Sequence, residues 1–217
     1  MPRFAAAIFD LDGTLIDTER LVIDAGLETL QDLGHQVSRD FMVSLVGIDE
    51  TEGHRRLCAQ LGVDLRAGPF DAAWSAATRR RYAEGIPLMA GVDHLLTELT
   101  RMRLPRAVAT NSTTQGARRK LTEAGLLHHF DTHHVVGFDA VARPKPAPDV
   151  FLAAAGRLGV AASDCVAFED SDTGVAAALA AGMTVVQIPD MLPANRRDAH
   201  HLAETILDGA RACGLID

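Results

Sequence analysis

The sequence predicts an α/β protein with a doubly wound parallel sheet and a separate, smaller helical segment. Short apolar runs recur along the chain, and such runs are typical of strands buried on both faces of a parallel sheet. From residue 87 onward, stretches with helical spacing separate these runs, which is the β-α alternation of a doubly wound fold. Between residues 17 and 85, apolar residues recur only at helical spacing, and this region predicts the helical segment.

The first predicted strand covers residues 5–9, an apolar run that ends at an acidic turn. Asp10 and Asp12 flank Leu11, so in extended backbone both carboxylates point the same way, and Gly13 then lets the chain turn sharply. Two carboxylates this close need a cation or a shared proton to stay together. The pair therefore suits a metal-bound nucleophile beside a general acid, as in phosphoryl transfer through an aspartyl-phosphate.

The predicted helical segment follows this acidic turn directly. Leu21, Ala25 and Leu30 recur at roughly helical spacing, and no strand-like alternation interrupts the segment. Glycines divide it into about four short helices. These helices could pack directly on the sheet. We expect a lid that forms a bundle of its own, because the segment is inserted after the acidic turn and ends at a plausible hinge, residues 84–87.

The remaining strands and helices alternate, and candidate chemical groups stand where the strands end. Strands are predicted at residues 106–110, 134–137, 165–168 and 184–188, and helices around residues 92–99, 117–124, 151–158 and 174–181. Ligands in such sheets bind beyond the carboxyl ends of the strands. The polar groups at or just past these ends are Asp10, Thr110, Asn111, Lys145, Glu169 and Asp170. We therefore expect them to form one site.

Three of these groups suit a phosphate. Thr110 offers a hydroxyl, and the Asn111 amide, near a helix start, offers an N–H to a phosphate oxygen. Lys145 offers a point charge to the same oxygens while helping to hold Asp10. Taken alone, residues 110–112 are a polar strand-to-helix cap and Lys145 is a solvated loop lysine. Their order after the acidic turn favours the functional interpretation.

The acidic groups suit a divalent cation. Glu169 and Asp170 are hard oxygen ligands, and with Asp10 and the Asp12 backbone carbonyl they fit octahedral Mg²⁺, which keeps water and accepts a phosphate oxygen. Acids this close would repel one another strongly without a metal ion and a lysine. By itself, the acidic run at residues 169–172 could simply favour the start of a helix.

Composition limits the partners. The 217 residues carry a formal charge of -8 and have a pI near 5.5, which gives no basic surface for nucleic acid. No apolar run approaches the length of a membrane span or a signal peptide. The three cysteines are widely separated and suggest neither disulfides nor a zinc site. We expect a soluble, cytoplasmic protein whose anionic substrate meets local positive charge at the site; the oligomeric state is not predicted.

The motifs together resemble the haloacid dehalogenase-like (HAD) superfamily, in its phosphatase branch. Residues 10–15, Asp-Leu-Asp-Gly-Thr-Leu, resemble the first motif, and the groups around Thr110, Lys145 and Glu169 resemble motifs two, three and four in that order. The resemblance spans the whole chain. It implies a Rossmann-like catalytic core of residues 1–16 and 86–217, with a small α-helical cap of residues 17–85.

The resemblance also implies a mechanism. By that likeness, Asp10 attacks phosphorus, and Asp12 protonates the leaving oxygen and then activates water. Thr110 and Lys145 hold the phosphoryl group. Mg²⁺ would be held by Asp10, Glu169 and Asp170 together with the Asp12 carbonyl. The expected substrates are small phosphorylated metabolites of the sugar phosphate or phosphoglycolate type. One departure from the usual pattern is Pro144, which stands where glycine commonly precedes the lysine of the third motif.

Three other functions are compatible with parts of this pattern. A dehalogenase of the same superfamily needs neither Asp12 nor Mg²⁺. A phospho-receiver signalling module is about half this length and has no helical insert. A β-phosphoglucomutase-like phosphomutase is the strongest alternative, but such mutases carry a basic residue in the cap loop after a glycine, and a histidine in the hinge. Here Gly47 is followed by Asp49 and Glu50, and Val22 stands at the histidine position. Acids there would repel a second phosphate, unless Arg20, Arg55 or Arg56 supplies the cation instead. We expect Gly47 and Glu50 to bind substrate in the cap.

Overall fold

The chain divides into two compact units. The computed structural model describes residues 3–46, 48, 50–65, 67–195 and 198–217. The first unit, here called the sheet unit, comprises Met1–Asp17 and Pro87–Asp217, and the second, the helical unit, comprises Thr18–Ile86.

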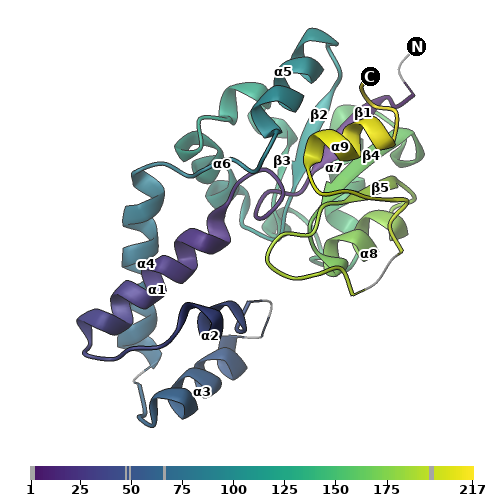
Figure 1. The fold of residues 1–217 in the computed structure, drawn as a ribbon. Helices are drawn as coiled ribbons and strands as arrows, with labels where there is room; N and C mark the ends of the chain where they lie inside the picture. The colour runs from purple at the N-terminus through teal and green to yellow at the C-terminus, as the bar shows by residue number, and fades with distance from the viewer. Residues whose placement is uncertain (1–2, 47, 49, 66, 196–197) are drawn as a thin grey trace. The chain divides into compact units, whose positions relative to one another are not determined.

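One parallel sheet forms the centre of the sheet unit. Its strands are β1 (Ala6–Phe9), β2 (Arg106–Ala109), β3 (Val135–Val136), β4 (Cys165–Glu169), β5 (Thr184–Gln187) and β6 (His201–Leu202). They are all parallel and lie in the order β3-β2-β1-β4-β5-β6 (Figure 1). The strand order reverses at β1, which has β2 on one side and β4 on the other. In such sheets, the crevice beyond the carboxyl ends at this reversal is the usual place for a ligand.

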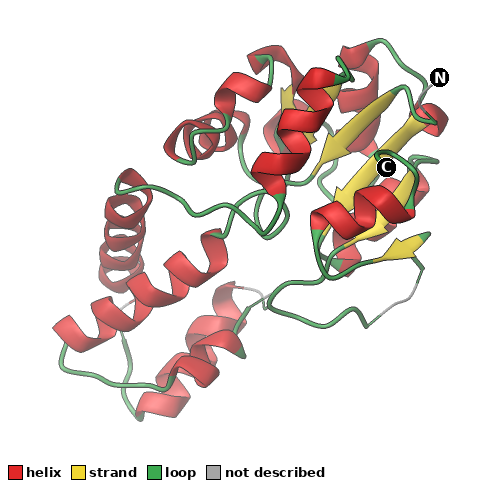
Figure 2. Cartoon of the chain, turned by 45° about the horizontal axis from the view of Figure 1, so that its top comes forward, coloured by secondary structure: helices red, strands yellow, loops and turns green. Residues whose placement is uncertain are grey.

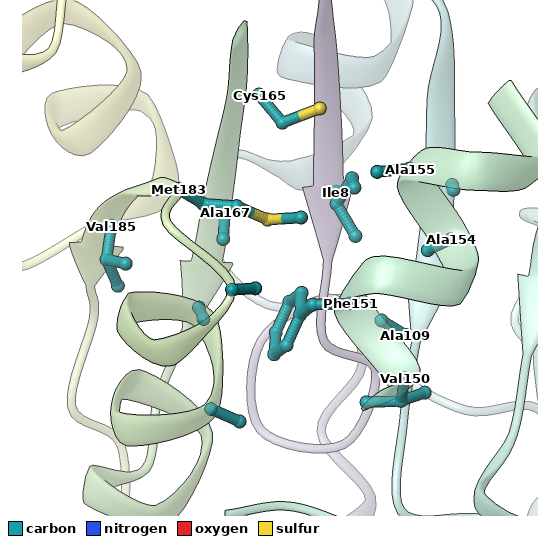
Figure 3. Close-up of a cluster of buried hydrophobic side chains, with 14 of the residues drawn as sticks. Ile8, Ala109, Val150, Phe151, Ala154, Ala155, Cys165, Ala167, Met183 and Val185 are labelled. Atoms are coloured by element: carbon teal, nitrogen blue, oxygen red, sulfur yellow. The ribbon is translucent and has the colours of Figure 1, made fainter. Parts of the chain in front are cut away.

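Two helices cover one face of the sheet. α7 (Asp149–Leu158) and α8 (Asp172–Ala180) contact each other and the strands beneath them. Phe151 of α7 belongs to a buried cluster with Ile8 of β1 and Ala167 of β4, which are partners across the strand ladder (Figure 3). Alanines supply many of the other members of this cluster, and their small side chains allow the helices to approach the sheet closely.

Other helices pack on the opposite side, as Figure 2 shows for the sheet unit. α5 (Val92–Arg101) packs against α9 (Ile206–Ala212), and α9 contacts β5 and β6, while α6 (Thr114–Glu123) contacts β3. Side chains alternate along a strand, so Phe9 faces away from the cluster around Ile8. Phe9 stacks on Phe168 with the ring centroids 5.0 Å apart. The sheet is therefore buried on both faces, as the apolar strand sequences predict.

Side-chain caps start two helices just beyond the carboxyl ends of strands. The Thr113 hydroxyl accepts a hydrogen bond from the Gly116 N–H at 3.1 Å and begins α6 shortly after β2. The Ser171 hydroxyl accepts from the Gly174 N–H at 3.1 Å and begins α8 directly after β4. Such caps satisfy backbone N–H groups that a helix start leaves without partners. They also bring two helix starts, with their partial positive charge, to the same edge of the sheet.

The helical unit contains four helices among its described residues: α1 (Thr18–Asp32), α2 (Arg39–Val43), α3 (Glu50–Leu61) and α4 (Ala67–Ala83). α1 packs along α4, and α2 packs on α1. The Trp74 indole of α4 donates a hydrogen bond to the Val22 carbonyl of α1 at 2.8 Å. Gly26 makes room for this ring, because a Cβ atom there would lie 2.8 Å from it.

The structure confirms the predicted α/β class and the parallel sheet. β6 was not predicted, because two residues, His201 and Leu202, give no apolar run to detect. The helical segment was expected to hold short helices, yet α1 and α4 have 15 and 17 residues. Within the described residues, no helix has both the length and the apolar character that crossing a bilayer requires.

Candidate active site

The carboxyl ends of β1 and β4 bring two acids together. Asp10 follows β1 directly, and its N–H donates to the Phe168 carbonyl of β4 at 2.9 Å. Glu169 is the last residue of β4 and is fully buried, and Asp10 is only 7% exposed. Because β1 and β4 are neighbours in register, these acids lie side by side at the strand reversal. Burying two carboxylates is unfavourable unless cations neutralise them.

Lys145 supplies one such cation. Its Nζ lies 2.5 Å from Asp10 Oδ1 and 2.6 Å from Glu169 Oε1, and its side chain is 3% exposed. The ammonium also lies over the Phe151 ring, 5.0 Å from the centroid, where a cation is attracted by the aromatic face. The sequence predicts that Lys145 holds Asp10, and the structure brings these two residues into contact. The contact with Glu169 was not predicted.

The pKa values in this cluster reflect burial and charge. Burial raises the pKa of Asp10 to about 7; the Lys145 ammonium opposes this rise and the Glu169 carboxylate adds to it. Burial by itself would lower the pKa of Lys145, but the carboxylates of Asp10 and Glu169 outweigh burial and raise it above its ordinary value. Two carboxylates share one ammonium, so the cluster can accept further positive charge.

A third acid completes a group that could hold a metal ion. Oxygen atoms of Asp10, Glu169 and Asp170 all lie within 4.8 Å of one another. The Thr14 hydroxyl reaches Asp170 Oδ1 at 3.5 Å, and the buried Gln187 amide donates to the Asp170 carbonyl at 3.4 Å. Clustered carboxylate oxygens are the donors that hard divalent cations prefer. The residues present therefore fit a divalent cation, on the three side chains that the sequence predicts as ligands.

Asp12 lies in the loop after β1, and its carboxylate has partners that sequence reasoning missed. Lys120 Nζ lies 2.7 Å from Asp12 Oδ1 and 2.9 Å from Oδ2. The Ser112 hydroxyl donates to Asp12 Oδ2 at 2.9 Å. Ser112 belongs to the polar stretch after β2, so its position carried a signal. Lys120 lies in the last turn of α6, within a run of cations, and nothing in the sequence singles it out from Arg118 or Arg119 as a partner of Asp12.

The predicted phosphate-binding residues Thr110 and Asn111 follow β2. Thr110 is buried, and its hydroxyl accepts from the Ser112 N–H at 3.0 Å. The Asn111 side chain makes two hydrogen bonds to the backbone of Lys145: its oxygen accepts from the Lys145 N–H at 2.9 Å, and its amide donates to the Lys145 carbonyl at 3.3 Å. The sequence predicts that an Asn111 amide contacts phosphate, whereas these contacts fix the backbone that carries Lys145.

Two glycines allow the acids to approach the backbone. A Cβ atom on Gly174 would lie 1.9 Å from the Glu169 carboxyl carbon, so only glycine leaves room for that side chain at the start of α8. Gly13 has a φ of +85°, and a Cβ atom there would lie 2.6 Å from Asp170 Oδ2. Gly13 was predicted as the residue that turns the chain. Gly174 was read only as part of an alanine-rich helix.

The helical unit has a pocket of its own. It encloses about 380 Å³ and is lined mainly by apolar side chains, including Val22, Leu57, Phe70 and Trp74. Its polar lining includes His54, whose buried Nδ1 atom has no hydrogen-bond partner among the residues that the structure describes. This volume and lining are typical of small-molecule pockets.

The sequence predicts Gly47 and Glu50 as substrate-binding residues of the helical unit. The structure describes only Glu50 of these two. Gly47, like Asp49, lies outside the described residues. Glu50 is described only as the first residue of α3.

The chain is similar to known phosphate-transferring enzymes over most of its length. The model of the haloacid dehalogenase-like hydrolase family matches residues 7–188. The fructose-1-phosphate phosphatase YqaB of Escherichia coli is 36% identical over 186 residues, which are 86% of this chain and 97% of that protein. The β-phosphoglucomutase of Bacillus subtilis is 27% identical over 190 residues, which are 84% of this chain and 82% of that protein.

A solved structure gives the same result. The crystal structure of a HAD family hydrolase from Deinococcus radiodurans, with bound phosphate and sodium, superposes with a TM-score of 0.85 at 25% identity. The match covers 100% of this chain and 99% of that one. These matches confirm the resemblance that the four sequence motifs carry. The chain belongs to the haloacid dehalogenase-like hydrolase family.

Proposed function

We propose that this protein is a Mg²⁺-dependent phosphatase that hydrolyses small phosphorylated metabolites, of the sugar phosphate or phosphoglycolate type, through an aspartyl-phosphate on Asp10. The observation that carries the proposal is the buried cluster of Asp10, Lys145 and Glu169, with Asp170 beside it. A relative named as a fructose-1-phosphate phosphatase supports the choice of a phosphoric monoester as substrate.

The reaction has two displacement steps at phosphorus. An Asp10 oxygen forms a bond to phosphorus while the bond to the leaving oxygen breaks, and Asp12 gives its proton to that oxygen. Asp12, now a carboxylate, takes a proton from water as the water oxygen attacks phosphorus. The bond from phosphorus to Asp10 then breaks, which releases inorganic phosphate and restores both side chains.

The remaining side chains hold the phosphoryl group and neutralise its charge. Lys145 lies between Asp10 and Glu169 and offers its charge to the phosphoryl oxygens as Asp10 becomes esterified. Thr110 and the backbone at the start of α6 offer donors to the same oxygens, and Asn111 keeps the Lys145 backbone in place. Asp10, Glu169, Asp170 and the Asp12 carbonyl would hold Mg²⁺. When bound, this ion draws charge from the phosphoryl oxygens and offsets repulsion between phosphate and the acids.

The helical unit is proposed as the cap that selects the leaving group. Its apolar pocket could receive the non-phosphate part of a substrate, but the sequence does not name that substrate.

The free state of Cys58, Cys165 and Cys213 supports a reducing compartment such as the cytoplasm.

A phosphomutase is the second candidate, because one relative is named as a β-phosphoglucomutase. A mutase must hold a second phosphate, and Val22, which stands at the place of the mutase histidine, lines the apolar pocket of the helical unit. We therefore prefer the hydrolase.

The test is phosphate release from a panel of phosphorylated metabolites that includes fructose 1-phosphate and phosphoglycolate. We expect turnover with Mg²⁺, no turnover in chelator, and a loss of several orders of magnitude in Asp10→Asn, because removal of the nucleophile leaves only positioning. Asp164→Asn is the matched control, since this exposed carboxylate lies at the opposite end of β4 and should leave turnover unchanged. Substantial activity in Asp10→Asn or in chelator would contradict the proposal.

The mutase alternative is tested in the same assay. The enzyme is incubated with β-glucose 1-phosphate, Mg²⁺ and a trace of glucose 1,6-bisphosphate. Rapid formation of glucose 6-phosphate that outpaces phosphate release would establish a mutase and overturn the hydrolase assignment.

A further inference from the structure

We propose that Lys120, together with Ser112, is a positioning residue that holds the Asp12 carboxylate in the orientation its proton transfers require. This proposal rests on the proposed function. Asp12 is the group that exchanges protons there, and the structure gives its carboxylate two partners from outside its own loop.

The three side chains form a closed set of contacts. Lys120 Nζ lies 2.7 Å and 2.9 Å from the two Asp12 carboxylate oxygens. The Ser112 hydroxyl lies 2.9 Å from Asp12 Oδ2 and 3.0 Å from Lys120 Nζ. Each group therefore contacts the other two. Rotation about either Asp12 side-chain torsion would break at least one of these contacts.

The ion pair between Lys120 and Asp12 is partly buried. The Lys120 side chain is 15% exposed and the Asp12 side chain 27% exposed, so both are largely shielded from solvent. Partly buried pairs are screened less than exposed ones. Some exposed pairs, such as Arg55 with Glu52, connect residues of one helix turn. Lys120 instead joins α6 to the loop after β1, 108 residues earlier in the chain.

The neighbouring cations of α6 point elsewhere. Arg118 donates to the Thr132 carbonyl at 2.6 Å, and Arg119 pairs with Glu123 at 3.7 Å with a side chain that is 52% exposed. A lysine near the end of a helix can also interact with the helix dipole. Lys120 is the cation in the last turn of α6, but that interaction alone would not direct its ammonium to the Asp12 carboxylate.

The contacts leave Asp12 able to exchange a proton. A carboxylate offers about four lone-pair sites, and Lys120 and Ser112 occupy up to three of them. Proton exchange needs one further site, turned toward the leaving oxygen or water. A carboxylate that is free to turn would present this site only part of the time, and small misplacements in proton transfer reduce rates strongly.

The test uses kcat/KM for two esters: p-nitrophenyl phosphate, whose leaving group departs without a proton, and a primary alkyl phosphate, whose leaving group needs one. We expect Lys120→Met to lower kcat/KM for the alkyl ester on the order of tenfold to a hundredfold, a part of what general acid catalysis contributes. The p-nitrophenyl ester should lose less than about threefold. Lys120→Arg should restore most of the alkyl ester activity, because a guanidinium can also contact both carboxylate oxygens.

Arg119→Met is the matched control, since it removes the adjacent cation of the same helix without touching Asp12. It should behave as wild type with both esters. Equal losses on both esters in Lys120→Met would indicate a structural defect and overturn the proposal. An increase in KM at unchanged kcat would make Lys120 a substrate-binding residue and also overturn it. A wild-type enzyme that hydrolyses neither ester would contradict the proposed function itself, whereas wild-type turnover that Lys120→Met leaves unchanged would overturn only the role of Lys120.

Discussion

The two units of this protein use charge in opposite ways. In the sheet unit, Lys145 contacts Asp10 and Glu169 with side-chain exposures of 3%, 10% and 0%. In the helical unit, Glu28 pairs with Arg80 and Arg81, and these side chains are 38%, 61% and 31% exposed. Burial of ionised groups costs free energy, whereas ion pairs at the surface contribute little to stability. A buried cluster of this kind marks a site where charge has a chemical role, whereas the exposed pairs are compatible with solvation alone.

The largest effect that tests this contrast should come from Lys145→Met. Two buried carboxylates would lose their cation, which should destabilise the fold by about 3–5 kcal/mol in metal-free buffer and abolish phosphate release. Urea unfolding and the phosphate assay measure the two effects. The matched change in the helical unit, Arg55→Met, removes an exposed cation from Glu52 and should leave both readouts close to wild type. If the two variants lost similar stability, the contrast between buried and exposed charge would be wrong.

A glycine in each unit provides a smaller effect. Gly174→Ala would place a Cβ atom against the Glu169 carboxyl group and should cost about 1–3 kcal/mol, with a loss of activity because Glu169 must move. Gly53→Ala is the counterpart in α3, where no atom of the described residues, apart from the helix's own backbone and the neighbours of Gly53, lies within 4 Å of the added carbon. It should stabilise the protein by roughly 0.5–1 kcal/mol, since alanine favours a helix. Thermal unfolding of both variants measures these changes in stability. If Gly53→Ala were destabilised and Gly174→Ala unaffected, our interpretation of the space around the two glycines would be wrong.

The smallest effect on the chemistry should follow from removal of the helical unit. The Asp17 N–H donates to the Pro87 carbonyl at 2.9 Å, so the ends left by deletion of residues 18–86 already lie side by side and a short glycine-serine linker can join them. We expect a folded sheet unit that still cleaves p-nitrophenyl phosphate but no longer discriminates among metabolites, because cap closure excludes water and contacts the leaving group. A deletion variant that keeps the full substrate preference would show that the cap assignment is wrong.

The sequence predicts the strand ends well because local patterns determine them. Residues 5–9 are wholly apolar, and a strand buried on both faces requires that pattern, so the position of Asp10 at the strand end follows from it. Glu169 follows from the same argument on β4. Both acids were therefore found without knowledge of the packing.

Contacts that depend on the packing of helices were not predicted. Lys120 reaches Asp12 only because α6 packs beside β3, and three adjacent cations in the sequence look equivalent. The contact of the Asn111 side chain with the Lys145 backbone, 34 residues away, was likewise not predicted. Gly174 could have been found from its place five residues after Glu169, where a helix start meets a buried acid. A single sequence does not give these tertiary distances.

Phe151 contributes both to the packing of the core and to the support of the active-site lysine. Its ring fills the centre of the cluster between the sheet and its covering helices, and the same ring lies beneath the Lys145 ammonium. The stability of the core and the placement of the lysine therefore both depend on one side chain. A substitution that improves the fit of this ring to its apolar neighbours also moves the surface on which the lysine rests. Substitution of Phe151 is therefore constrained both by core packing and by the contact with Lys145. We expect compensating changes among its alanine neighbours before the ring itself is replaced.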